Sequence, residues 1–280
     1  MNACESALIP IREKFEVFGI SYAVDGLLGR GAFGCVSHIK RITPSGKIQE
    51  LAAKEQKTKK GVRELDRLLP FQQHPHIIRL YGFGPVEGNF VIVMERARHG
   101  DLHKYVGCFP KGLPKPVARA FYDQVLNAVH YLHQGRVAHC DIKPKNILVM
   151  GAGHVRLTDF GQAALMDGED LCRNTGTPSY KPPENLRKKK INGVRQDLWG
   201  AAASYVYMII GQNPWILPSY GDPSYLHFRR GSIFQYSVNS GWMRFMAWEE
   251  FDHLQRLLHD DPDRRLIPTG YNRKITSSFL

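Results

Sequence analysis

The feature that most restricts the possible folds is a change in hydrophobic periodicity near residue 97. Before this point, residues 20–28, 35–42 and 48–54 are rich in β-branched and apolar side chains, which is typical of β-strands. A Thr-Pro-Ser-Gly sequence at residues 43–46 separates the last two and predicts a tight turn. Together these segments predict a twisted antiparallel sheet.

The same half of the chain carries two further strand patterns and one short helix. A basic helix is expected at residues 62–69, followed by strands at 77–81 and 90–94. The pair Gly88-Asn89 lies between these two strands and predicts a turn. The first part of the chain is therefore predicted to be rich in β-structure, with one helix.

Beyond Gly100 the pattern becomes helical. Apolar residues recur three or four positions apart along one helical face, at Val117, Phe121, Val125, Ala128 and Leu132. Further helices are expected at residues 197–210 and 249–259. The predicted fold class is α+β: a small antiparallel sheet lobe with one helix, a larger and mainly helical lobe, and a ligand-binding cleft between them.

The composition is strongly basic. The 280 residues include 38 Lys and Arg against 26 Asp and Glu, a formal net charge of +12, which steers acidic partners toward a protein. Apart from runs at residues 57–60 and 187–190, the basic residues are scattered, and no nucleic-acid-binding motif accompanies them. The preferred interpretation of both runs is a solvated loop, and the next is a site for acidic partners. For the run at residues 187–190, a nuclear localisation signal is a third and less favoured interpretation. Nucleic acid is not expected as a partner.

The spacing of the cysteines and the length of the apolar runs indicate in which cellular compartment the protein is expected. The five cysteines are too far apart for a disulfide framework, and no Cys-x-x-Cys pair offers the spacing of zinc ligands. Charged residues interrupt the amino terminus, and no apolar run approaches bilayer length. We therefore expect an intracellular protein of the cytoplasm or nucleus, monomeric, without a signal peptide or a membrane span.

Gly29, Gly31 and Gly34 form a Gly-x-Gly-x-x-Gly pattern at the turn between the first two predicted strands. A side chain at such a position would hold the backbone away from phosphate oxygens, and tight turns need positive φ angles. The same spacing opens dinucleotide-binding folds, but there a helix follows, whereas residues 36–42 are predicted to be a strand. A purely structural glycine turn is the other alternative.

Lys54 ends the third predicted strand, in an apolar Leu-Ala-Ala-Lys sequence. Burying a lysine without a partner is costly, so it needs a carboxylate, and Glu64 on the following helix is the nearest good candidate. In the alternative interpretation, the Lys54 side chain extends outward into solvent.

The segment at residues 137–148, Val-Ala-His-Cys-Asp-Ile-Lys-Pro-Lys-Asn-Ile-Leu, is followed by Thr-Asp-Phe-Gly at 158–161. Two short predicted strands between these motifs would bring Asn146 and Asp159 to one place. One amide and one carboxylate suit Mg²⁺, which takes a few hard oxygen ligands besides phosphates and water. Asp141 is then available to accept or orient a hydroxyl proton.

Taken in order, the glycine loop, the strand lysine, the two motifs above and a late Pro-Pro-Glu at 182–184 resemble the eukaryotic protein kinase family. The resemblance implies transfer of the γ-phosphate of Mg-ATP to proteins. It covers residues 22–268 and implies these parts of the chain: an amino-terminal extension (1–21), a small lobe (22–94), a hinge (95–100), a large lobe (101–268) and a short tail (269–280).

By this resemblance, Asp141 would be the catalytic base, Lys143 would contact the transferring phosphate and Lys54 would hold the α- and β-phosphates. Asn146 and Asp159 would bind Mg²⁺. The residues implied in ATP binding are Leu28, Gly29, Gly31, Gly34, Val36, Ala52, Lys54, Glu64, Met94, Glu95, Ala97, Asp101 and Leu148.

Lys143 is similar to the lysine that serine/threonine kinases carry two residues after the catalytic aspartate, and Thr177 resembles its partner. Residues 107–133 look most like the calcium/calmodulin-dependent branch of the family. Residues 176–184 resemble a peptide-docking loop, which implies protein substrates rather than small molecules. Because of Lys143 and Thr177, the resemblance implies specificity for Ser and Thr.

Two further resemblances concern the scaffold rather than the chemistry. Asp197 stands at the start of a helix that is expected to anchor the segment at residues 137–148, which resembles the family's catalytic loop and is called the catalytic loop below. An arginine of the Asp-Pro-Asp-Arg-Arg sequence at 261–265 is expected to pair with Glu184.

The sequence departs from the family at two informative places. Cys140 replaces the arginine that gathers an activation-segment phosphate in relatives, and Arg173 stands about where the phosphorylated threonine would be. Activity without activation-loop phosphorylation is therefore expected. The ten residues from Lys54 to Glu64 are fewer than usual, so the helix that carries Glu64 must be short or begin abruptly.

A pseudokinase that serves as a scaffold or binding module is the alternative from another functional class. Loss of at least one catalytic residue is the usual mark of such proteins, whereas Lys54, Asp141, Asn146 and Asp159 are all present. An active enzyme is therefore the preferred interpretation.

Overall fold

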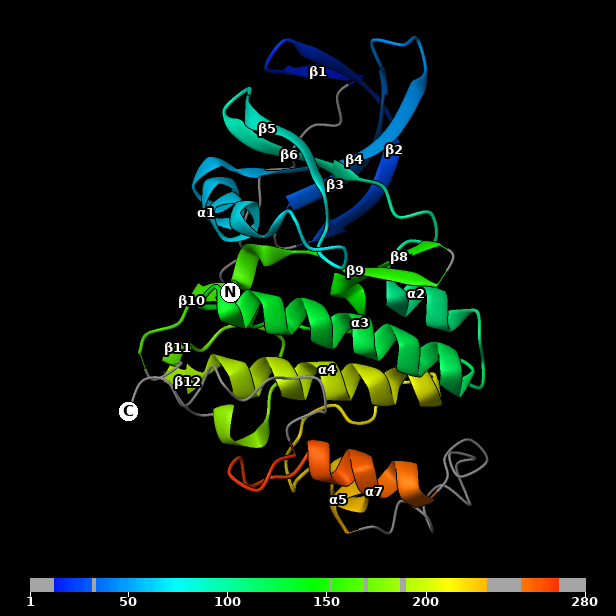
Figure 1. The fold of residues 1–280 in the computed structure, drawn as a ribbon, viewed down its shortest axis with the longest axis vertical. Coiled ribbons are helices and arrows are strands. Elements are labelled where there is room, and N and C mark those ends of the chain that lie inside the picture. Colours follow the sequence, from blue (N-terminus) through cyan, green and yellow to red (C-terminus); the bar gives the residue numbers. More distant parts are fainter. Residues whose placement is uncertain are drawn as a thin grey trace, which may run out of the picture. The chain divides into compact units, whose positions relative to one another are not determined.

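The computed structural model describes residues 13–31, 34–151, 153–168, 171–186, 190–230 and 248–266 (Figure 1). The predicted tail at 269–280, most of the basic run at 187–190 and the start of the predicted extension at 1–21 lie outside the described residues. The chain divides into two compact units, the first formed by Met1–Gln72 with Ile78–Arg96 and the second by Gln73–Ile77 with Ala97–Leu280.

In the described part of the first unit, the strands form one antiparallel sheet of six strands in the order β1-β2-β3-β4-β6-β5. The strands are β1 (Lys14–Val17), β2 (Ile20–Gly31), β3 (Gly34–Ile42), β4 (Ile48–Lys57), β5 (Leu80–Val86) and β6 (Asn89–Glu95). Val17 of β1 also approaches Gly84 of β5, so the two edge strands of this sheet come together and the sheet curls around its apolar face.

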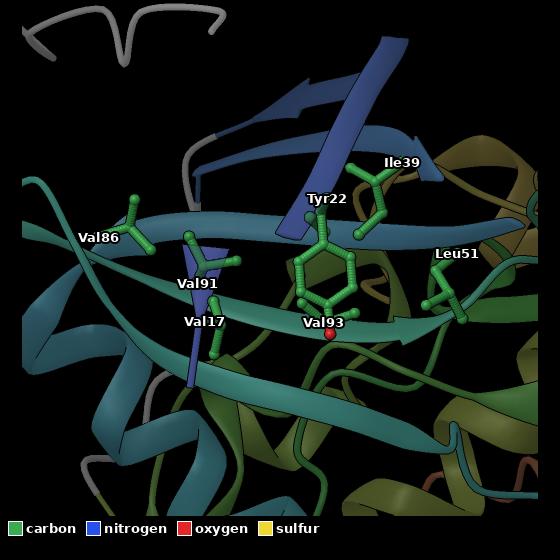
Figure 2. Close-up of a cluster of buried hydrophobic side chains, with 8 residues drawn as sticks. Val17, Tyr22, Ile39, Leu51, Val86, Val91 and Val93 are labelled. Atoms are coloured by element: carbon green, nitrogen blue, oxygen red, sulfur yellow. The ribbon is translucent and has the colours of Figure 1, made fainter. Parts of the chain in front are cut away.

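One face of this sheet carries the buried core of the unit. Figure 2 shows the cluster of side chains that fill it: Val17, Tyr22, Ile39, Leu51, Ala53, Val86, Val91 and Val93. Successive side chains of a strand point to opposite faces. Because Leu51 and Ala53 belong to the cluster, Ala52 and Lys54 of the same strand lie on the other face.

The strand predictions for residues 20–28, 35–42, 48–54 and 90–94 are confirmed, and the turn at 43–46 closes with a hydrogen bond from Gly46 N to Thr43 O (2.8 Å). The strand predicted at residues 77–81 is present, but its predicted start is wrong. The strand begins at Leu80, whereas Ile77 makes an isolated bridge to Leu157 within the second unit. Strand β1 was also not foreseen, because four residues of mixed polarity carry too weak a pattern.

Helix α1 (Thr58–Leu68) begins immediately after the last residue of β4, Lys57. This abrupt start confirms the expectation from the short spacing between Lys54 and Glu64. The helix begins four residues earlier than the sequence pattern at 62–69 predicted, because the basic first turn is exposed and adds no apolar periodicity.

The described part of the second unit is mainly helical, as predicted. Its helices are α2 (Leu102–Gly107), α3 (Lys115–Gln134), α4 (Gly193–Ile210), α5 (Pro223–Arg229) and α7 (Trp248–Leu257). Three short antiparallel pairs accompany them: β7 (Val137–Ala138) with β10 (Ala164–Leu165), β8 (Ile147–Gly151) with β9 (His154–Leu157), and β11 (Leu171–Arg173) with β12 (Lys190–Asn192).

Helix α4 forms the centre of this unit, with α3 alongside it (Figure 1). Every residue of α4 except Arg195 is buried. The Asn192 side chain caps its first turn by accepting a hydrogen bond from Arg195 N (2.9 Å), and Gly211 ends it in the left-handed region, at φ 76°. None of the described helices is both long and apolar enough to cross a bilayer.

His74 and His76 are expected to make the stability of the second unit depend on pH. Burial lowers the pKa of both imidazoles, and the contact of His74 with Asn127 (2.6 Å) opposes this only in part. The folded state therefore binds fewer protons than the unfolded state below the ordinary histidine pKa of about 6.5. Stability should be full above that pH and should decrease as the pH falls.

Thermal unfolding at about pH 7.5 and 5.5 tests this expectation. The melting temperature should fall with pH in the parent protein, and it should fall less in the double variant His74→Gln, His76→Gln. Equal decreases in the two proteins would contradict the expectation.

Candidate active site

The glycine loop lies at the β2–β3 turn of the first unit. Gly34 has φ 128°, and a Cβ atom there would lie 2.2 Å from the backbone oxygen of Glu55, so packing alone requires glycine. A Cβ at Gly29 or Gly31 would meet no described atom within 4 Å. The structural alternative of a purely packing-driven glycine turn thus accounts for Gly34 and leaves the other two glycines unexplained.

Lys54 forms a buried ion pair with Glu64. Its Nζ atom lies 2.8 Å and 2.7 Å from the two carboxylate oxygens, and the two residues are 6% and 2% exposed. Gln56 donates a further hydrogen bond to Glu64 (2.7 Å). The predicted pairing is confirmed, because the abrupt start of α1 brings Glu64 to the β4 lysine despite the short spacing.

The other predicted nucleotide-binding residues of the first unit surround this ion pair on the sheet. Val36 is the cross-strand partner of Lys54, and Met94 is the partner of Ala52, so all four share the face opposite the buried cluster. Leu28 is exposed on β2 beside the glycine loop. Glu95 ends β6, where its carboxylate accepts a hydrogen bond from Arg79 N (2.8 Å).

In the second unit, Asp141, Lys143 and Thr177 form a closed hydrogen-bonded network. Lys143 Nζ donates to Asp141 Oδ2 (2.7 Å) and to Thr177 Oγ1 (2.7 Å). The Thr177 hydroxyl and backbone N–H both donate to Asp141 Oδ1 (2.7 and 2.8 Å). The network joins the catalytic loop to the predicted docking loop, although 36 residues separate Asp141 from Thr177.

Asn146 and Asp159 are brought together by the β8–β9 pair, as predicted. Thr158 N donates to Asn146 O (2.9 Å), which places the next residue, Asp159, beside Asn146. The Asn146 side chain donates to the backbone oxygen and to Oδ2 of Asp141 (2.8 and 3.0 Å). Its amide nitrogen is thereby fixed, which leaves the amide oxygen as the group suited to a hard cation.

Asp197 anchors the catalytic loop from within α4. Its carboxylate is fully buried and accepts hydrogen bonds from the backbone N–H groups of His139 and Cys140 (both 2.7 Å) and from the His133 ring (2.8 Å). Cys140 itself has φ 64°, in the left-handed region. The two backbone contacts hold this strained backbone in place, so the anchoring role predicted for Asp197 is confirmed.

The residues expected at the start of the large lobe lie along β8. His99 N donates to Val149 O (3.2 Å), and Asp101 makes an isolated bridge to Leu148. The Asp101 carboxylate caps α2 by accepting a hydrogen bond from Lys104 N (2.8 Å). Ala97 belongs to the same segment but to no helix or strand.

Two contacts support the segment from Asp159 to Glu184, called the activation segment below. The Cys140 and Cys172 sulfur atoms lie 3.6 Å apart, both buried, and the contact with Cys172 together with burial raises the pKa of Cys140 well above its usual value. Arg265 donates two hydrogen bonds to the Glu184 carboxylate (2.9 and 3.0 Å). The second contact was predicted, whereas no sequence signal indicated the first.

Comparisons with known proteins agree with this geometry. The CBL-interacting protein kinase 4 of Oryza sativa subsp. japonica is 29% identical over 88% of this chain and 55% of its own length. The CBL-interacting protein kinase 30 of the same plant is 32% identical over 69% of the chain and 42% of its own length. The human NUAK family SNF1-like kinase 2 is 32% identical over 67% of this chain and 31% of its own length.

The chain therefore spans between about a third and a half of the length of these relatives. A model of the protein kinase domain matches residues 22–273. With the buried Lys54–Glu64 pair, the Asp141 network and the Asn146–Asp159 arrangement, this match shows that the chain belongs to the protein kinase domain family.

Proposed function

We propose that this chain transfers the γ-phosphate of ATP to Ser and Thr hydroxyls of other proteins. The observation that carries the proposal is the network of Asp141, Lys143 and Thr177, which combines an acceptor for a hydroxyl proton with a cation suited to a phosphate. The relatives above are named as kinases, and their names support the same kind of activity.

The first unit offers groups that fit a nucleotide triphosphate. Gly29 and Gly31 carry no Cβ that would keep an anion from the backbone, and nothing in the described chain requires glycine there. The Lys54 ammonium is held in place by Glu64 and is available as a point charge for phosphate oxygens. We infer that these residues bind ATP.

Asn146 and Asp159 fit Mg²⁺ by their chemistry, because both offer hard oxygen ligands. Among the described residues, no group of three or more His, Cys, Asp or Glu side chains suits a metal ion. A cation held by Asn146 and Asp159 would share its coordination with phosphates and water, as Mg²⁺ does in phosphoryl transfer. When bound, it supplies positive charge to the phosphates.

The proposed catalytic step depends on how Asp141 exchanges its hydrogen bonds. A carboxylate has about four acceptor positions, and Thr177, Lys143 and Asn146 occupy them. An incoming hydroxyl must replace one donor. Lys143 is the donor best able to move, because its long stem is flexible and the phosphate offers it another partner. Asp141 can then orient the hydroxyl and accept its proton.

We further propose that activity does not require a phosphate on the activation segment. Cys140, which replaces the arginine that relatives are expected to pair with a phosphate, instead contacts the neutral Cys172 sulfur. Arg173 lies opposite Lys190 in the β11–β12 pair, and Thr175 Oγ1 donates to Gln162 O (3.1 Å). The part of the segment around Cys172, Arg173 and Thr175 is thus held by neutral contacts and strand pairing.

Treatment with a Ser/Thr protein phosphatase is expected to leave the activity of this kinase unchanged within experimental error, because none of these contacts involves a phosphate. The measurement is the initial rate of substrate phosphorylation before and after treatment, once the phosphatase has been removed. A kinase that needs activation-loop phosphorylation, treated in parallel, serves as the control. Loss of activity in both enzymes would contradict the proposal.

The kinase activity itself is tested with radiolabelled ATP, Mg²⁺ and a mixture of dephosphorylated proteins, followed by analysis of the phosphorylated amino acids. Phosphoserine and phosphothreonine are the expected products. Phosphotyrosine alone would refute the assigned specificity. Binding of ATP without transfer to any protein would favour the scaffold function instead.

A further inference from the structure

Lys181 is a cation of the predicted docking loop at residues 176–184. Within the described part of the chain, its ammonium makes one hydrogen bond, to the neutral amide oxygen of Asn174 (2.9 Å). The side chain is half-buried, and this burial lowers the Lys181 pKa, while the charge of Asp141 opposes the lowering. Lys181 is thus close enough to Asp141 to be affected by its charge. The group that Lys181 binds directly, the Asn174 amide, is uncharged.

The docking loop is held rigidly, which allows it to select among ligands. Trp215 Nε1 donates to Ser179 O (3.0 Å), and the Tyr180 hydroxyl donates to Asn213 Oδ1 (2.8 Å). At the other end, Thr177 is fixed to the catalytic loop as described above. A cation on a preorganised loop loses little conformational entropy when it binds an anion.

The position of the loop beside Asp141 determines which part of a substrate passes Lys181. A hydroxyl that reacts must come within about 2.6–3.2 Å of Asp141. An extended peptide advances about 3.3–3.6 Å per residue. The residues next to the acceptor therefore pass over the loop that Thr177 attaches to Asp141.

We propose that Lys181 makes this enzyme select Ser or Thr residues that have an Asp or Glu within about two positions. This inference rests on the proposed kinase function and names its substrate class. A carboxylate of the substrate would give the Lys181 ammonium the charged partner that Asn174 does not provide. The net charge of +12 adds long-range attraction for acidic proteins.

The test uses synthetic peptides that are identical except for Glu, Ala or Lys at each position next to a single Ser. In the parent enzyme, kcat/KM should be about two- to fivefold higher for Glu than for Ala at the best position, mainly through a lower KM. In Lys181→Met this ratio should fall to about one, and in Lys181→Glu the Lys peptide should become the better substrate. Lys181→Arg should keep the preference.

Lys47→Met is the matched control, since Lys47 is exposed at the β3–β4 turn of the other unit and should leave the preference unchanged. Melting temperatures of all variants show whether they are folded. A preference for Glu that persists in Lys181→Met and Lys181→Glu, or no preference in the parent enzyme, would overturn the inference. Absence of transfer to every peptide by a protein that binds ATP would overturn the kinase function, and with it the inference.

Discussion

Asp141→Asn is expected to lower kcat for phosphate transfer by about 10²–10⁴-fold, the usual contribution of a positioned general base. The amide has nearly the same shape, but it cannot accept a proton at neutral pH. Because the amide has one acceptor oxygen in place of two, it also cannot accept the hydrogen bonds of Thr177 and of Lys143 together, which now reach different carboxylate oxygens. The measurement is single-turnover transfer at saturating ATP, together with ATP affinity, which should change little.

Asp263→Asn is the control for this substitution, because its side chain is 77% exposed and pairs with Arg195 at the surface. It should retain the parental rate. A loss of less than about tenfold in Asp141→Asn would contradict the assignment of Asp141 as the base. The same variant separates enzyme from scaffold in cells, because a scaffold would keep its biological effect without this carboxylate.

Asp197→Ala is expected to lower the free energy of unfolding by about 3–5 kcal/mol, the range for removing one partner from a buried charged network. The substitution leaves the N–H groups of His139 and Cys140 and the ring of His133 without their acceptor, in a fully buried place. Chemical denaturation followed by fluorescence measures the loss. Activity should fall with it, because the catalytic loop loses its anchor to α4.

Asp263→Ala is the matched control for stability, and it should cost less than about 1 kcal/mol, as exposed ion pairs do. A cost below about 1 kcal/mol for Asp197→Ala as well would show that the catalytic loop does not depend on this carboxylate. The loss of stability in Asp197→Asn should lie between those of Asp263→Ala and Asp197→Ala, since the amide oxygen can still accept hydrogen bonds from one side.

The parts of the site that could be predicted from sequence are those fixed over short distances along the chain. Asn146 lies five residues from Asp141 and bonds to it, and the β8–β9 hairpin brings Asp159 back to Asn146. Lys54 and Glu64 are ten residues apart, and one strand and one helix join them. In each case local structure alone limits where the partner can be.

Errors in the strand predictions have an equally local cause. Residues 77–81 are apolar enough for a strand, but Ile77 forms an isolated β-bridge with Leu157 within the second unit, and the strand begins only at Leu80. Hydrophobic periodicity reports that a segment is buried and does not say against which partner it packs.

The sequence by itself determined the chemistry of this protein: the types of residue, their order and the local loops that present Lys54, Asp141, Asn146 and Asp159. Only the tertiary structure decided which distant groups meet them. The Cys140–Cys172 contact spans 32 residues, and Lys181 becomes a candidate for substrate selection only because Thr177 attaches its loop to Asp141. Such pairs depend on how buried surfaces fit together, and that fit is a property of the whole packed chain rather than of any segment.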